Sequence, residues 1–193
     1  DLSKNFKIID IDNFKINFKN SKKILNNLNL KKNNSSIIIE GKSFDASRII
    51  NDIIDSDDES SSIFENLNSK INIKIKKTFI NEVDFINSLY GYINYDNNKI
   101  NDLKLESFFP NKKKISLSIK NNKNSEIITK LFTANPKPLV KRYNFIKGFE
   151  EGYLDFYSSK KDDVSNSVLI IDNFKVKEVP VFAKILSLAS LQG

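Results

Sequence analysis

The chain alternates repeatedly between apolar and polar residues, and this period of two constrains its fold more than any other feature. The clearest example runs from Lys70 to Phe79, where Ile71, Ile73 and Ile75 alternate with asparagine and lysine. Successive side chains of a β-strand point to opposite faces of a sheet, so such a segment has one apolar and one polar face. The pattern predicts strands buried on one face, as in an antiparallel sheet with one wet face.

The same alternation recurs along most of the chain and predicts nine or ten strands. The predicted strands are Phe6–Lys19, Ile24–Leu30, Ile37–Glu40, Lys70–Phe79, Phe85–Tyr95, Ile100–Phe108, Ile115–Ile119, Glu126–Thr133, Tyr153–Ser159 and Val168–Asp172. Polar segments separate them. Lys31–Ser35 is predicted to be a turn, Asp96–Lys99 a hairpin turn, and Pro110 with Lys112–Lys114 another turn.

Three segments have helical rather than strand periodicity. In residues 43–55, Phe44 and Ile49 share a helical stripe with Ile50, Ile53 and Ile54, and Asp45 or Ser43 is the predicted N-cap. A second short helix is predicted to start with Asn135 as N-cap and Pro136 as its first residue. The third starts at Pro180 and is apolar around most of its circumference; its apolar residues are Val181, Phe182, Ile185, Leu186, Leu188 and Ala189. Such a helix packs on the sheet as a lid or lies on lipid.

The composition removes the commonest catalytic chemistries. The chain has no Cys, His, Met or Trp, which excludes the usual zinc sites, cysteine nucleophiles and Ser-His-Asp triads. Adjacent carboxylates such as Asp57/Asp58 and Glu150/Glu151 would point to opposite faces of a strand, so they make no acid–base pair. The acidic segment Asp55–Ser62 lacks the glycine and spaced glutamate of a calcium loop and is interpreted as a solvated linker. We therefore expect no enzyme, no metal and no cofactor.

The basic charge is weak evidence for a nucleic-acid partner. The 193 residues carry 31 Lys plus Arg against 24 Asp plus Glu, a net charge of +7, but Arg48 and Arg142 are the only arginines. Arginine is the residue best suited to bidentate contacts with bases and phosphates. Asn, Lys and Ile make up more than two-fifths of the chain, as expected from an AT-rich coding sequence. The Lys112–Lys114 run could contact phosphate but is typical of a solubilising turn. No nucleic-acid partner is predicted.

The chain is predicted to be one β-rich segment of a longer protein. Its parts are residues 1–60 with strands and a short helix, residues 66–120 with a strand meander, and residues 125–193 with a distinct end element. There is no initiator methionine, and Asp1-Leu2-Ser3 begins in the middle of a pattern. No run of about eighteen apolar residues is present, so no membrane span is predicted within these bounds.

The predicted helices are too few to cover the predicted sheet. Nine strands about 4.8 Å apart make a sheet roughly 43 Å wide, and three helices about 10 Å across would cover about two-thirds of it. The remaining apolar face must fold on itself, pack on further chain or hold an apolar ligand. The candidate residues for an apolar, lipid-binding groove are Ile71, Ile73, Ile75, Leu103, Leu105, Ile115, Leu117, Ile119, Leu154 and Phe156.

The last third of the chain has a distinctive order of elements. A strand and a short helix lead to a glycine-bearing turn and strand over Lys147–Phe156, followed by Ile171–Val176 and the apolar segment Val179–Gly193. From about residue 125 onward this order resembles the C-terminal region of the AsmA-like family of bacterial envelope proteins. The likeness is to the large YhdP-type members with alphaproteobacterial character. The bulk of Val179 and Phe182 departs from the family pattern, which often has smaller residues or leucine there.

The resemblance implies a fold and a function. The fold would be mainly β, an antiparallel curved sheet forming a U-shaped, β-taco-like trough capped by the C-terminal apolar helix. The whole protein would be tethered to the inner membrane by an N-terminal anchor missing from this chain and would extend across the periplasm. Phospholipid acyl chains would lie in its groove during transport between the inner and outer membranes, and other envelope proteins would be partners. The alternative is a structural or assembly module of outer-membrane biogenesis with a self-closed β core and no transport role.

Overall fold

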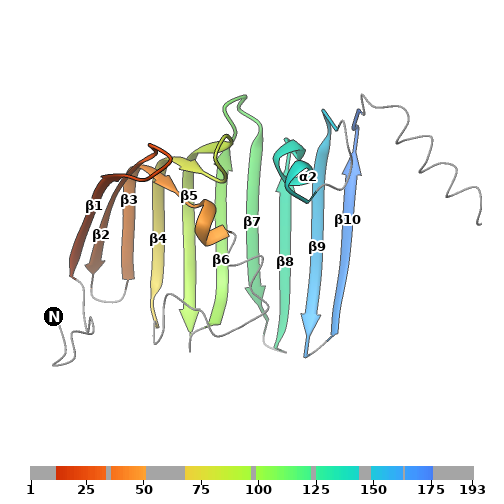
Figure 1. Cartoon of the computed structure of the whole chain (residues 1–193). Helices are drawn as coiled ribbons and strands as arrows, with labels where there is room; N and C mark the ends of the chain where they lie inside the picture. The colour runs from red at the N-terminus through yellow and green to blue at the C-terminus, as the bar shows by residue number, and fades with distance from the viewer. Residues whose placement is uncertain are drawn as a thin grey trace, which may run out of the picture.

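One sheet of ten strands forms the body of the protein (Figure 1). The computed structural model describes residues 12–33, 36–50, 68–96, 99–122, 125–143, 149–162 and 164–175. The strands are β1 (Asn13–Lys19), β2 (Leu25–Asn33), β3 (Ser36–Asp45), β4 (Lys70–Phe79), β5 (Phe85–Asp96), β6 (Lys99–Phe108), β7 (Lys114–Asn121), β8 (Glu126–Thr133), β9 (Tyr153–Lys161) and β10 (Val164–Asp172). They lie side by side in chain order, so the sheet is open and β1 and β10 are its edges.

The predicted mainly β fold is confirmed, and the predicted antiparallel pairing is present between all neighbouring strands except β3 and β4. β4 and β8 have the predicted bounds. β4 has a clear period of two, and β8 lies between a polar turn at its start and the Asn135-Pro136 helix start after its end. The predicted hairpin at Asp96–Lys99 is also present, since these two residues pair across β5 and β6. The alternation was therefore sufficient to find the strands and most of their antiparallel neighbours.

The prediction of a purely antiparallel meander was wrong at one place. β3 and β4 are parallel, with Ile37 opposite Ile71 and Ile39 opposite Ile73. Parallel neighbours require a crossover of a dozen or more residues, usually containing a helix. Residues 46–69 make this connection, and residues 47–50 are helical. The helical periodicity between the two strands was the available sign of a crossover.

Several predicted boundaries were also wrong, because pairing with a neighbouring strand continues past the end of the apolar pattern. Lys31–Asn33 belong to β2 rather than to a turn, and Phe44 belongs to β3 rather than to a helix. Lys114 is the first residue of β7. β10 starts at Val164, four residues before the predicted start. The helix α2 (Lys137–Tyr143) begins one residue later than predicted, and its first backbone bond runs from Val140 N to the Pro136 carbonyl.

Asp45 ends β3 and caps the helical residues that follow, as predicted. Its Oδ1 accepts hydrogen bonds from the Ser47 backbone N (3.0 Å) and Oγ (2.5 Å), and Asn20 Nδ2 donates to its Oδ2 (2.7 Å). Burial alone would raise the pKa of the Asp45 carboxyl, but the bonds from Ser47 and Asn20, aided by the charge of Lys22, outweigh burial and lower it. Asp45 therefore fixes both the start of the crossover and the turn between β1 and β2.

Removing this cap is expected to destabilise the protein modestly. Asp45→Ala should lower the free energy of unfolding by about 1–2 kcal/mol, because the Ser47 and Asn20 donors lose their acceptor. Asp45→Asn keeps a capping oxygen and should lower it by only a few tenths of a kcal/mol. Urea unfolding followed by circular dichroism measures both. An equal loss for the two variants would show that charge, not capping, accounts for the effect.

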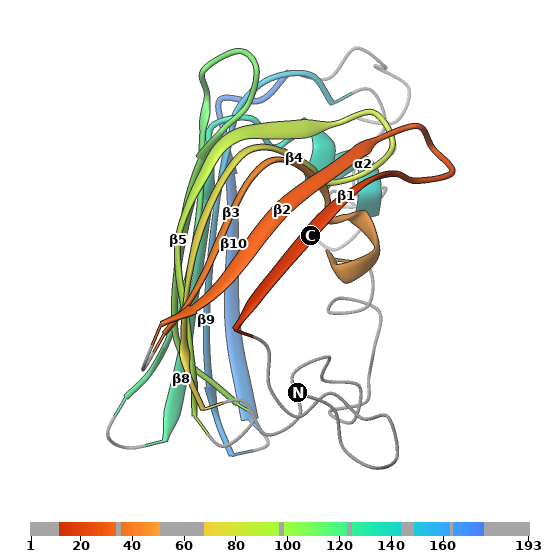
Figure 2. The same ribbon diagram turned by 90° about the vertical axis from the view of Figure 1, so that its left-hand side faces the viewer.

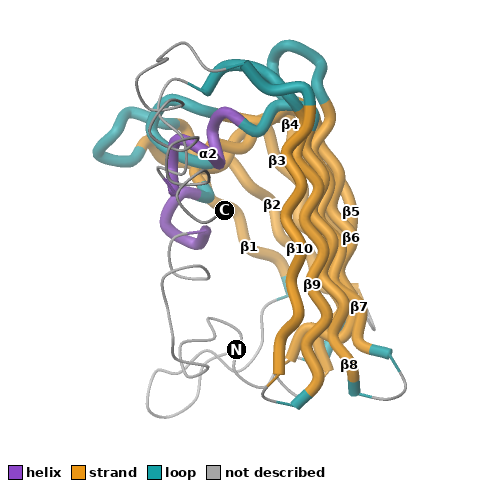
Figure 3. The backbone as a smooth tube through the Cα atoms, turned by 90° about the vertical axis from the view of Figure 1, so that its right-hand side faces the viewer, coloured by secondary structure: helices purple, strands orange, loops and turns teal. Residues whose placement is uncertain are grey.

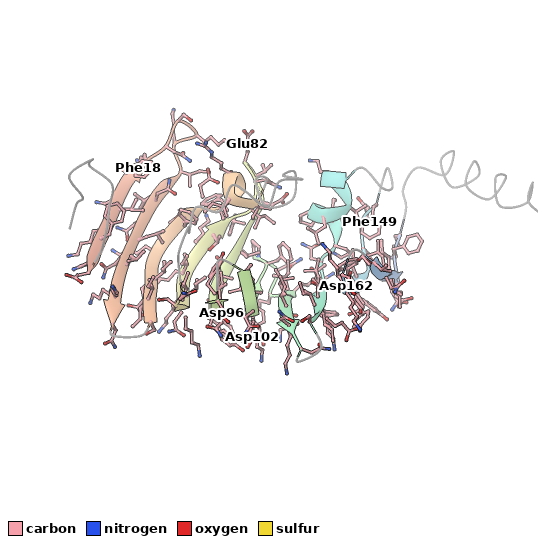
Figure 4. All side chains as sticks on the ribbon, turned by 90° about the horizontal axis from the view of Figure 1, so that it is seen from below. Phe18, Glu82, Asp96, Asp102, Phe149 and Asp162 are labelled. Atoms are coloured by element: carbon pink, nitrogen blue, oxygen red, sulfur yellow. The ribbon has the colours of Figure 1, made fainter. Side chains whose placement is uncertain are left out.

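The two faces of the sheet differ in what covers them. Val140 of α2 is fully buried, and so is Thr133 in β8, while Leu154 in β9 is 3% exposed. α2 and residues 47–50 lie on the same side of the sheet, and the upper ends of β4 and β5 curve towards that side (Figures 2 and 3). Seen from below, Phe18 and Phe149 also lie on this side, whereas Asp102 lies on the opposite one (Figure 4).

Candidate functional site

A row of apolar side chains crosses the sheet from one edge to the other. Residues paired directly across neighbouring strands point to the same face, so the strand registers define which side chains share a face. The row consists of Phe14, Leu30, Ile39, Ile73, Gly91, Leu105, Leu117, Leu131, Phe156 and Leu169. Every member is apolar or glycine. We call it the central row, and ten strands about 4.8 Å apart give it a length of roughly 43 Å.

All ten predicted groove residues lie on the face that carries the central row, here called the apolar face. Ile73, Leu105, Leu117 and Phe156 belong to the row itself. On one side of the row, the registers place Ile71, Leu103 and Ile119 at one level. On its other side lie Ile75, Ile115 and Leu154. Ile71, Ile75, Leu103 and Leu154 are buried, whereas the other six are half-buried.

Sequence reasoning did not place the remaining members of the central row. The alternation put Phe14 on one face with Ile16 and Phe18, but it contained no information on which residues of other strands lie opposite. At the two edges the row is open: Phe14 is 50% exposed and Leu169 is 45% exposed. The central row is thus half-buried in the middle of the sheet and exposed to solvent at both edges.

Gly91 interrupts the central row at a close approach between the backbones of β5 and β6. Its φ of 145° lies in a region that residues with a Cβ rarely adopt. A Cβ at this position would collide with the carbonyl oxygen of Lys104 in the neighbouring strand. The glycine is therefore required by the backbone approach, and it leaves a gap in the row between Ile73 and Leu105.

Ionic and tyrosine contacts organise the opposite face, here called the polar face. The Glu106 carboxylate accepts hydrogen bonds from Lys114 Nζ (2.7 Å) and Tyr90 OH (2.8 Å), and Lys104 Nζ lies 3.5 Å away. The Lys114 and Tyr90 bonds lower the pKa of Glu106 from 4.5 to about 2, and the Glu106 bond raises the pKa of Tyr90 and of Lys114. Glu106 is thus held ionised and is a poor general acid.

The Glu106 cluster predicts a specific pH dependence of stability. A carboxyl whose pKa is lower in the folded state stabilises the fold above its unfolded pKa of 4.5, and this stabilisation disappears as the pH falls towards 2. Wild type should therefore unfold at higher urea concentration than Glu106→Gln at pH 7, and the difference should shrink between pH 4.5 and 2. Tyr90→Phe, which removes one donor, should give a smaller difference in the same window. A difference that does not vary with pH would contradict this role of Glu106.

A second tyrosine–carboxylate pair lies beside the first. Tyr92 OH donates to Asp102 Oδ2 (2.9 Å), and the Lys70 ammonium lies 4.5 Å from the centre of the Tyr92 ring. The hydrogen bond to Asp102 raises the pKa of Tyr92. These contacts on β4–β6 hold polar side chains against one another and leave the apolar residues to the other face. The order of residues along β5 places Tyr90 and Tyr92 on the face opposite Leu89 and Ile93, but it contains no information on their carboxylate partners.

Two predicted features lie outside the described residues. One is the acidic segment Asp55–Ser62. The other is the predicted lid helix, with the residues Val181, Phe182, Ile185, Leu186, Leu188 and Ala189. Within the described part of the chain, no group of three or more Asp or Glu side chains lies close enough to hold a metal ion. Over the same residues, no helix is long and apolar enough to cross a membrane.

The geometry defines an open β-sheet protein with one apolar face and an opposite face that is largely polar on β1–β7. On β10 this second face also carries the exposed apolar side chains of Val168 and Ile170. Its most distinctive surface is the apolar face, which is continuous across all ten strands. No protein-family model, curated protein or solved structure matches the chain. Two features of the chain therefore bear on its function, namely the apolar face and the resemblance of residues 125–193.

Proposed function

We propose that the apolar face binds phospholipid acyl chains, as part of an envelope-spanning protein that moves phospholipid between the inner and outer membranes. The observation that carries this proposal is the central row, an apolar path perpendicular to the strands in which only Gly91 lacks a side chain. In the proposal the curved sheet is one segment of a U-shaped trough, and the path runs along the trough. The chain would then be a conduit without catalytic residues or cofactors.

The dimensions and energetics of the apolar face suit an acyl chain. The central row is roughly 43 Å long, compared with about 30 Å for the hydrocarbon core of a bilayer. Each methylene group removed from water contributes about 0.8 kcal/mol, so even partial burial of one acyl chain gives appreciable binding. The head group would remain in water beyond the edge of the face. Exposed Phe14 and Leu169 at the sheet edges provide apolar surface where a chain could enter or leave.

The alternative proposal is a structural module of outer-membrane biogenesis with a self-closed β core. Closure would require strands distant in the sheet order to pack face to face. Among the described residues, the extensive contacts are those between neighbouring strands, and β1 and β10 remain at opposite edges. This arrangement favours the groove over the closed core.

The location of the protein is part of the same proposal. The resemblance of residues 125–193 supports a periplasmic position, with the whole protein tethered to the inner membrane. It also supports a C-terminal apolar helix that caps the end of the trough, and envelope proteins as partners. The location, the capping helix and the partner proteins are all proposed from the resemblance alone.

Lipid extraction from the purified protein tests the proposal. Protein expressed in bacteria should carry phospholipid that native mass spectrometry detects as discrete added masses and that solvent extraction recovers. Delipidated protein should take phospholipid up again from vesicles. Protein that purifies without lipid and takes up none from vesicles would favour the closed structural module instead.

A further inference from the structure

The polar face contains a basic groove at the end of the sheet formed by β1–β4. The groove has a volume of about 500 Å³, and its charged residues are Lys15 of β1, Glu40 and Lys42 of β3, and Lys74 and Lys76 of β4. Four ammonium groups thus face a single carboxylate. Because these residues lie on the face opposite the central row, the groove is separate from the proposed acyl-chain surface.

No ion pair within 4.0 Å neutralises the lysines of this groove among the described residues. Lys104 and Lys114 contact Glu106, whereas none of the ion pairs among the described residues involves Lys15, Lys42, Lys74 or Lys76. Like charges on neighbouring strands destabilise a sheet. An uncompensated group of this kind is relieved when an anion binds to it.

The spacing of the lysines favours more than one anionic group. Lys42 of β3 and Lys76 of β4 lie opposite each other, because Gly41 pairs with Ile75 and Phe44 pairs with Thr78 in these parallel strands. The backbones of the two lysines are therefore about 4.8 Å apart. Lys74 is two residues along the same strand, so all three ammonium groups can reach one phosphate. Lys15 lies three strands away from β4, about 14 Å, and can reach a second one.

Neutral polar groups in the groove complete the site. Asn17, Asn27 and Asn29 line it beside the lysines, and Asn27 Nδ2 donates to Asn17 Oδ1 (3.2 Å). The side-chain oxygen of Asn29 is buried without a hydrogen-bond partner. Side-chain amide nitrogens such as those of Asn17, Asn27 and Asn29 are neutral donors that phosphate oxygens can accept from. We propose that this basic groove binds phosphate groups of a ligand that carries at least two of them.

Binding of pyrophosphate and of phospholipid vesicles tests the groove. Isothermal titration calorimetry with pyrophosphate measures binding of free phosphate. Sedimentation with phosphatidylcholine vesicles, with and without phosphatidylglycerol, measures binding of head groups. Pyrophosphate binding without sedimentation would assign a soluble phosphate ligand, and selective sedimentation with phosphatidylglycerol would assign a head group. Absence of both would overturn the proposal.

Two variants distinguish binding of phosphate in the groove from nonspecific attraction to the basic charge of the chain. Replacing Lys15, Lys42, Lys74 and Lys76 by Gln should weaken binding at least tenfold. A control with the same change of charge replaces exposed lysines outside the groove; these are Lys113, Lys120, Lys141 and Lys160. It should weaken binding less than twofold at 150 mM salt, where distant charges are screened. Equal weakening by both variants would overturn the proposal.

A third variant should change binding in the opposite direction. Glu40→Gln removes the one carboxylate of the groove and should tighten binding of the probe severalfold. A loss of function through misfolding cannot produce tighter binding, so this result would be informative even if the lysine variant were unstable. Unchanged or weaker binding would contradict the proposed site. Ile73→Asp, on the apolar face, should leave phosphate binding unchanged, which keeps this test independent of the proposed acyl-chain surface.

Discussion

Replacing Gly91 by alanine is expected to destabilise the sheet more than any other single change considered. The new Cβ would collide with the Lys104 carbonyl oxygen, and the backbone would have to leave its φ of 145°. Neither can be relieved by moving a flexible side chain, so we expect a loss of about 3–5 kcal/mol in the free energy of unfolding. Urea unfolding and the yield of soluble protein measure this loss.

Ser88→Gly provides a control on the same strand. Ser88 has a φ of 54°, which is costly for a residue with a Cβ but not for glycine. The substitution should leave stability unchanged or raise it by up to about 1 kcal/mol. A Gly91→Ala variant as stable as wild type would show that β5 and β6 do not approach as closely as described.

The second large effect is expected from a charge on the apolar face. Ile73 lies in the central row, half-buried between Ile39 and Gly91. If the apolar face is an open acyl-chain groove, Ile73→Asp should leave the protein folded, because the carboxylate can still reach water. The free energy of unfolding should fall by about 1–3 kcal/mol. Bound phospholipid should fall at least tenfold, since a charge replaces apolar surface along the path of the acyl chain. Lipid extraction and circular dichroism measure the two effects.

Asn72→Asp adds the same charge to the same strand but on the polar face. It should leave both lipid content and fold unchanged. In a self-closed core, by contrast, Ile73→Asp would cost several kcal/mol and unfold the protein. The acyl-chain groove would be contradicted if the Ile73→Asp variant were unfolded. It would also be contradicted if Asn72→Asp lost as much bound phospholipid as Ile73→Asp.

The sequence predicts the strands well because alternation is a local property. The isoleucines of β4 and the leucines of β6 show their shared face within ten residues. Which residues stand opposite them depends on pairing between strands, and a shift of one residue would reverse every assignment. The central row therefore could not be predicted, although all ten residues suggested for the groove lie on its face.

Asparagine has structural roles that composition alone did not suggest. Asn20 Oδ1 accepts backbone bonds from Lys22 (3.1 Å) and Ile24 (3.0 Å), and Asn81 Oδ1 accepts them from Val83 (2.9 Å) and Asp84 (2.6 Å). Such bonds fix tight turns because the short side chain imitates a backbone carbonyl. An AT-rich coding sequence can supply the asparagines, but their positions in turns are required by the fold.

The basic groove was missed for a related reason. Lys15, Lys42, Lys74 and Lys76 come from three strands and look like solubilising residues when each strand is considered alone. The parallel pairing of β3 and β4 brings Lys42 beside Lys76. This pairing departs from the expected meander, so no sequence pattern could have grouped these lysines.

Site-specific photo-crosslinking tests the central claim most directly. A photo-crosslinking amino acid is placed at the position of Leu117, in the central row, or of neighbouring Ser118, on the polar face of the same strand. After incubation with phospholipid vesicles and illumination, mass spectrometry detects lipid adducts. An acyl-chain groove predicts an adduct at position 117 and little or none at position 118. Equal labelling at the two positions, or none at 117, would contradict it.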